Sequence, residues 1–156
     1  MNRISVLLFM MIFSISCSSE KAENRENTPG KMISGTWKLL TGTLIEKGDT
    51  VVTDYTQNKS FIKIINDSHF AFFMHDLKKG KDSATAAFSS GGGSYTLNGD
   101  SYTEHLEYCS AREWEANDFT FTVTINNDTL IQQGIEKIES EGINRMNIEK
   151  YVSVKK

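Results

Sequence analysis

A strict alternation of apolar and polar residues over short segments is the feature that most constrains the fold of this chain. Residues 119–125 show it most clearly, because Phe119, Phe121, Val123 and Ile125 are separated by single threonines. A period of two places alternate side chains on opposite faces of a β-strand. The pattern therefore predicts a half-buried strand with its threonines in water.

Segments of the same kind recur from Gly35 to the C-terminus, and each ends at residues typical of turns. Asn98-Gly99-Asp100 is the strongest hairpin signal. No window has a convincing helical period, although residues 135–145 have room for one short helical turn. The expected strands cover residues 36–46, 51–55, 59–65, 69–75, 85–88, 94–97, 102–108, 119–125, 129–133 and 147–154.

Many short strands joined by hairpins predict an all-β domain. A sandwich and an up-and-down antiparallel barrel both fit such a pattern of short strands. The whole chain has 156 residues, which is enough for one domain with a substantial core and too short for two.

The N-terminus has the features of a secretory signal. Arg3 precedes an apolar run that is too short to span a bilayer, and small residues follow it. Ser14-Ile15-Ser16-Cys17 resembles the lipobox of bacterial lipoproteins, in which the cysteine is acylated and becomes the first mature residue. The resemblance implies a signal peptide over residues 1–16 and lipidation of Cys17. An ordinary secretory signal cut near Ser16 is the alternative.

Residues 17–33 are predicted to be the lipidated cysteine followed by a flexible tether. The stretch 18–31 is dominated by small and charged residues and contains the only proline of the chain, Pro29. Such a composition cannot bury enough apolar surface to offset the entropy of ordering. We expect the folded domain to occupy residues 34–156. By resemblance to lipoprotein sorting, Ser18-Ser19 favours an anchor in the outer membrane.

Composition and spacing argue against several classes of function. The net charge is −3 with no basic stripe, which argues against nucleic-acid binding. His69 and His75 would lie about 20 Å apart along one strand and cannot share a metal ion. Acylation of Cys17 would leave Cys109 without a disulfide partner, so we expect a buried thiol there. We predict a monomer with no metal, no cofactor and no enzymatic activity.

A carboxylate is predicted to point into the barrel. Alternation in residues 102–108 places Glu104 on the same face as two tyrosines, and a buried carboxylate is costly without a partner. Lys63 is a candidate partner, since it shares a face with Phe61. The pair is either a structural ion pair or part of a ligand cup. The candidate cavity residues are Lys63, Tyr95, Tyr102, Glu104, Tyr108 and Gln132.

Gly35-Thr36-Trp37 resembles the G-x-W opening of lipocalins and their bacterial relatives. Later segments, including residues 91–97 and 102–108, resemble small lipocalin-like domains found in lipoproteins of Bacteroidetes-type bacteria. The resemblance extends over roughly residues 35–154. It implies an up-and-down antiparallel β-barrel of about 8–10 strands, of the calycin type, in which Trp37 plugs the closed end.

Two functions are compatible with these features. The first is a lipid-anchored envelope protein that binds a small amphipathic or apolar molecule in its barrel. The second is a non-catalytic envelope protein with a filled barrel, whose outer face or loops contact another protein. A pocket of a few hundred Å³ would favour the first. Trp114 is expected either over the barrel mouth or in an exposed apolar patch.

Overall fold

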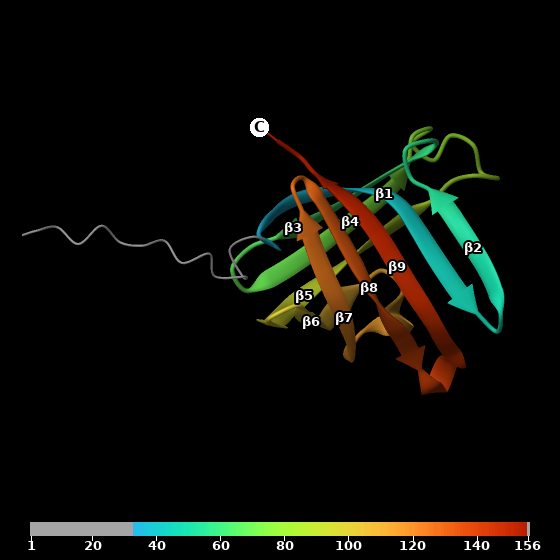
Figure 1. Ribbon diagram of the computed structural model, residues 1–156. Coiled ribbons are helices and arrows are strands. Elements are labelled where there is room, and N and C mark those ends of the chain that lie inside the picture. The colour runs from blue at the N-terminus through green and yellow to red at the C-terminus, as the bar shows by residue number, and fades with distance from the viewer. Residues whose placement is uncertain (1–32, 156) are drawn as a thin grey trace, which may run out of the picture.

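The computed structural model describes residues 33–155, which form one antiparallel sheet that closes on itself (Figure 1). The expected signal peptide, Cys17 and the tether up to residue 32 lie outside the described residues. The strands are β1 (Gly35–Glu46), β2 (Asp49–Asp54), β3 (Lys59–Ile65), β4 (His69–Asp76), β5 (Phe88–Asn98), β6 (Ser101–Cys109), β7 (Asn117–Asn126), β8 (Thr129–Ile138) and β9 (Ile143–Ser153), with single 3-10 turns η1 (Arg112–Trp114) and η2 (Glu139–Glu141).

The sheet order confirms the predicted fold class. Strands follow the order β2-β1-β3-β4-β5-β6-β7-β8-β9, and pairing of β1 with β9 closes eight of them into an up-and-down barrel. The remaining strand, β2, lies outside this circuit beside the second half of β1 (Figure 1). The architecture is consistent with a lipocalin-like barrel. The described residues contain no helix that is both long enough and apolar enough to cross a membrane.

Strand β1 changes its inward face halfway along. Its register against β9 shifts between Leu39 and Thr41, so Leu40 is an extra residue. An extra residue moves every following side chain to the other face of the sheet. Leu39 is therefore buried in the core, whereas Gly42 faces the interior further along. At the same point β1 exchanges its partner β3 for β2.

The barrel end at which β1 begins, here called the closed end, is filled by apolar side chains. Trp37 is buried there, and its indole Nε1 donates a hydrogen bond of 2.8 Å to the carbonyl of Ile33. Ile33 is itself buried in the core, so the expectation that the tether extends through residue 33 is wrong for its last residue. The core consists of Ile33, Trp37, Leu39, Ile65, Phe70, Tyr102, Leu106, Phe119, Phe121, Val123, Leu130, Ile138 and Tyr151.

Two expected segments differ from the structure. Residues 85–87 lie outside any strand, and β5 begins only at Phe88. The turn η2 agrees with the one short helical turn expected within residues 135–145, but the rest of this stretch is mostly strand, because β8 continues to Ile138 and β9 begins at Ile143. The sequence did not reveal this continuation, because the buried positions between Leu130 and Ile138 are the polar Gln132 and Glu136, while Ile135 is exposed. Apolar alternation cannot reveal a strand whose inward face is polar.

Candidate functional site

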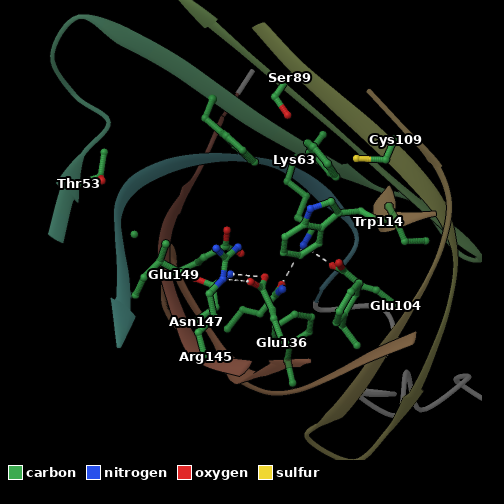
Figure 2. A pocket seen from close by; sticks show the side chains of 18 of the residues that line it. Thr53, Lys63, Ser89, Glu104, Cys109, Trp114, Glu136, Arg145, Asn147 and Glu149 are labelled. Atoms are coloured by element: carbon green, nitrogen blue, oxygen red, sulfur yellow. Dashed lines mark hydrogen bonds and ion pairs between the residues drawn. The ribbon is translucent and has the colours of Figure 1, made fainter. Parts of the chain in front are cut away.

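A cavity of about 320 Å³ occupies the half of the barrel opposite the closed end, here called the open half (Figure 2). All eight strands of the closed circuit contribute to its wall, together with Thr53 of β2 and Trp114 of η1. Its charged lining residues are Lys63, Glu104, Glu136, Arg145 and Glu149, and its aromatic lining residues are Tyr55, Phe61, Phe72, Trp114, Phe119, Phe121 and Tyr151.

Lys63 links three strands across the floor of the cavity. Its ammonium group donates to the Glu104 carboxylate on β6 and, at 2.9 Å, to the Gln132 side-chain oxygen on β8. The three residues are 3%, 7% and 1% exposed. The Lys63 Nζ also lies 5.3–5.8 Å from the ring centroids of Phe70, Tyr102 and Tyr151. Ion pairing, hydrogen bonding and cation–π contacts together offset the cost of burying these charges.

A second ion pair lies closer to the barrel mouth. Glu136 of β8 accepts hydrogen bonds from Arg145 Nε at 2.8 Å and from Asn147 Nδ2 at 2.7 Å (Figure 2). The guanidinium carbon of Arg145 lies 4.9 Å from the Trp114 ring centroid, and Trp114 in turn packs on Phe119 at 5.7 Å. Trp114 therefore folds over the cavity, as one of the two expectations for it had proposed.

Glu149 of β9 has a different environment. Its Oε2 accepts a hydrogen bond of 2.7 Å from the Tyr151 hydroxyl. Within residues 33–155, no Lys, Arg or His nitrogen lies within 4.0 Å of its carboxylate. Burial raises the pKa of Glu149, while the charge of Lys63 and the Tyr151 hydrogen bond act in the opposite direction.

The ring of Tyr55 packs beside Glu149 because β1 carries a glycine there. Gly42 pairs with Glu149 in the β1–β9 ladder, and a Cβ on Gly42 would lie 3.2 Å from the Tyr55 ring. The backbone amide of Tyr55 donates to the carbonyl of Leu40, the extra residue of β1, at 2.9 Å. Burial and, second, the Glu149 carboxylate raise the pKa of Tyr55. The bulge in β1 thus positions an aromatic wall next to the carboxylate.

Three of the predicted cavity residues, Lys63, Glu104 and Gln132, line the cavity, and the Lys63 ammonium group donates to both of the others. Tyr95 and Tyr102 belong instead to the packing below it. Their rings lie 5.1 Å apart, and the Tyr95 hydroxyl donates to the Asn66 carbonyl at 2.8 Å. The Tyr102 hydroxyl is fully buried without a hydrogen bond among the described residues. Burial and the Glu104 charge raise the pKa of Tyr102.

The expectation that Tyr108 faces the cavity is wrong, because its side chain is 70% exposed. The β5–β6 register shifts between Gly92 and Gly93, which makes Glu107 an extra residue in β6. The shift turns Tyr108 outward and places Cys109 in the cavity wall. Gly93 permits the bulge, since a Cβ there would overlap the carbonyl oxygen of His105. The triple glycine of residues 91–93 is therefore part of β5, opposite the bulge in β6.

Sequence reasoning missed Glu136, Arg145, Asn147 and Glu149. Residues 145, 147, 149 and 151 alternate along β9, and all four side chains line the cavity. Their polarity concealed the strand period, which apolar residues ordinarily reveal. One signal was usable: these residues of β9 lie two, four and six positions before the buried Tyr151, so a regular strand places them on the same inward face.

The histidines lie away from this cavity. His105 Nδ1 is 2.8 Å from Asp118 Oδ1 at the barrel surface, and Ser68 and the Asp76 carbonyl contact the other two. In the part of the chain that the structure describes, no group of three or more His, Cys, Asp or Glu residues has an arrangement suited to a metal ion.

A search of protein-family profiles finds no match to this chain, and a search of curated proteins finds no similar sequence. A function for this barrel must therefore be argued from the geometry of the cavity itself.

Proposed function

We propose that this chain is a lipid-anchored lipocalin-like protein of the bacterial cell envelope, and that its barrel binds a small amphipathic molecule. The observation that carries the proposal is the partly open cavity of about 320 Å³. Ligand sites are typically concave, with apolar and aromatic walls and a few fixed polar groups, and occupy about 300–1,000 Å³. The aromatic wall of this cavity and its charged groups, which ion pairs fix in position, match that description. Its volume favours a small ligand.

The proposed anchor is an acyl group on Cys17. A chain extends by roughly 3.3 Å per residue, so the segment between Cys17 and Ile33 spans up to about 50 Å. Several acyl chains each contribute about 0.8 kcal/mol per buried methylene, which is sufficient for stable attachment. We further propose that the protein is a non-catalytic monomer in the outer membrane.

Mass spectrometry of the protein extracted from its host tests the anchor. We expect a mature N-terminus at Cys17 that carries acyl chains, with the protein recovered in outer-membrane fractions. Cys17→Ala should abolish acylation and maturation at this position. A wild-type protein that is cut near residue 16, unmodified and released from membranes would establish the ordinary secretory signal instead.

Native mass spectrometry of the same material tests the ligand. We expect a bound small molecule that is lost in Leu44→Trp, because Leu44 lines the cavity and an indole there would fill it. Ile45→Trp is the matched control, since Ile45 follows in the same strand and is 37% exposed. Consistently empty protein, with no thermal shift across a panel of lipids and metabolites, would overturn the binding proposal.

A filled structural barrel is the second candidate, and one observation favours it. The pairs Lys63–Glu104 and Arg145–Glu136 satisfy each other within the protein and need no ligand. If such pairs are purely structural, Leu44→Trp should leave all interactions with envelope proteins unchanged. Crosslinking in intact cells, followed by comparison of wild type and Leu44→Trp, separates this candidate from a ligand-dependent role.

A further inference from the structure

The charges that line the cavity do not balance. Three carboxylates, those of Glu104, Glu136 and Glu149, face two cations, those of Lys63 and Arg145. Each cation is committed to one carboxylate, Lys63 to Glu104 and Arg145 to Glu136. Among the described residues this leaves Glu149 with a tyrosine hydroxyl as its hydrogen-bond donor and no cation within ion-pair distance. The cavity therefore carries one surplus negative charge when all five groups are ionised.

The groups around Glu149 determine which ligand charge the cavity accepts. Lys63 on β3 attracts the carboxylate, whereas Glu104 on β6 and Glu136 on β8 repel it. An anionic ligand would add a further negative charge to a poorly hydrated space whose cations are already paired, which is unfavourable. A cationic ligand would instead supply the missing partner.

The wall beside Glu149 is also suited to a cation. Tyr55 meets Phe61 edge-on at 5.8 Å between ring centroids, and Phe61 lies 6.3 Å from Tyr151 and 5.7 Å from Phe72. Aromatic faces attract ammonium groups, most strongly where water is excluded. The same rings provide apolar surface for the rest of a ligand.

We infer that the cavity takes a small organic cation, an ammonium or a related group on an apolar body, whose charge pairs with Glu149 while its body lies against Tyr55 and Phe61. This inference rests on the proposed small-molecule function and specifies its ligand class. The charge of the ligand is fixed by Glu149, and the size of its body is limited by the volume of about 320 Å³.

Isothermal titration calorimetry of the purified protein at pH 7 tests the inference with hexylamine, hexan-1-ol and hexanoate, which differ only in the head group. A desolvated charge-assisted contact predicts that hexylamine binds at least about tenfold more tightly than the other two. Glu149→Gln should remove this advantage and leave the affinity for hexanol within about twofold, since the amide still accepts the Tyr151 hydrogen bond.

Two further variants separate charge from structure. Glu149→Asp retains the charge and should keep the preference for the amine. Glu141→Gln makes the same charge change at an exposed position and should leave all three affinities unchanged. Equal or tighter binding of hexanol or hexanoate, or an unchanged amine preference in Glu149→Gln, overturns the cation inference while small-molecule binding stands. Failure of all three compounds to bind at millimolar concentration also overturns it, and native mass spectrometry of host material then decides the broader proposal separately.

Discussion

The two ends of the barrel are built from the same strands but are held together by different interactions. At the closed end, side chains such as Trp37, Val123 and Leu130 are apolar and buried. In the open half, the inward residues of β8 and β9 include Glu136 and Glu149, and space remains between them. The first region gains its stability from burial of apolar surface, whereas the second retains charged groups at a cost in stability.

Bulges allow one strand to serve both regions. The extra residues Leu40 in β1 and Glu107 in β6 each reverse the inward face partway along the barrel. Gly42 and Cys109 consequently reach the cavity, although a regular strand would point them outward. The comparison teaches that the packed core and the cavity are separated along the barrel axis, with the Lys63–Glu104 pair at the boundary.

The largest expected effect comes from removing a bulge. Gly93→Ala places a Cβ against the His105 carbonyl oxygen and 2.8 Å from the Glu107 amide nitrogen, neither of which can move without breaking the ladder. We expect a loss of at least about 4 kcal/mol in the free energy of unfolding, measured by urea denaturation. Gly42→Ala is the control, since only the Tyr55 ring must adjust there. Similar losses in both variants would contradict the role of the bulge.

Breaking the boundary ion pair should have the next largest effect. Lys63→Met leaves the Glu104 carboxylate buried without its cation, which costs about 3–5 kcal/mol. Lys63→Met combined with Glu104→Leu should recover most of that loss, because no buried charge then remains unpaired. Urea denaturation of the two single variants and the double variant gives the coupling free energy. Additive effects of the single substitutions would show that the pair is not the link between the two regions.

Matched truncations compare the two regions directly. Leu130→Ala removes a fully buried side chain at the closed end and should cost about 2–5 kcal/mol. Trp114→Ala removes a larger side chain above the cavity, and we expect a loss of only about 1 kcal/mol because this residue is partly exposed. Thermal unfolding of both variants measures the difference. A greater loss for Trp114→Ala would mean that the open half also carries the stability of the barrel.

Most strands could be predicted from the sequence, because the closed end has apolar residues at alternate positions and turn residues between its strands. Apolar alternation in residues 119–125 and the turn at Asn98-Gly99 predicted β7 and the β5–β6 hairpin correctly. These signals are local, so neighbouring residues alone reveal them. The number of such strands fits both a sandwich and a barrel. The barrel was predicted from the resemblance of Gly35-Thr36-Trp37 to the lipocalin opening.

The site was only partly predictable because its strands depart from that apolar alternation. Lys63, Glu104 and Gln132 were identified since each interrupts an apolar face. Tyr108 was misplaced because a bulge leaves no signal in the β6 sequence itself, and its cause, Gly93, lies on the neighbouring strand. Glu149 was missed because polar inward positions look like a solvent-exposed face.

The smallest expected effect, and the sharpest probe of the open half, is the pH dependence of Glu149→Gln. Burial raises the pKa of Glu149 in the folded protein, so the wild type is stabilised below the unfolded-state pKa and loses that contribution as pH rises through the folded-state pKa. Glu149→Gln should therefore be more stable than wild type at pH 7, and the difference should vanish as pH falls to about 4. The neighbouring groups that act on this carboxylate remain in both proteins; they are Lys63, Glu104, Glu136 and Tyr151. The difference in stability between wild type and variant at each pH therefore reports on Glu149. Urea midpoints measured between pH 4 and pH 8 test this, with Glu141→Gln as the exposed control. A variant that is less stable than wild type at neutral pH would mean that the ionised Glu149 stabilises the fold, and would argue against an unpaired carboxylate that awaits a ligand.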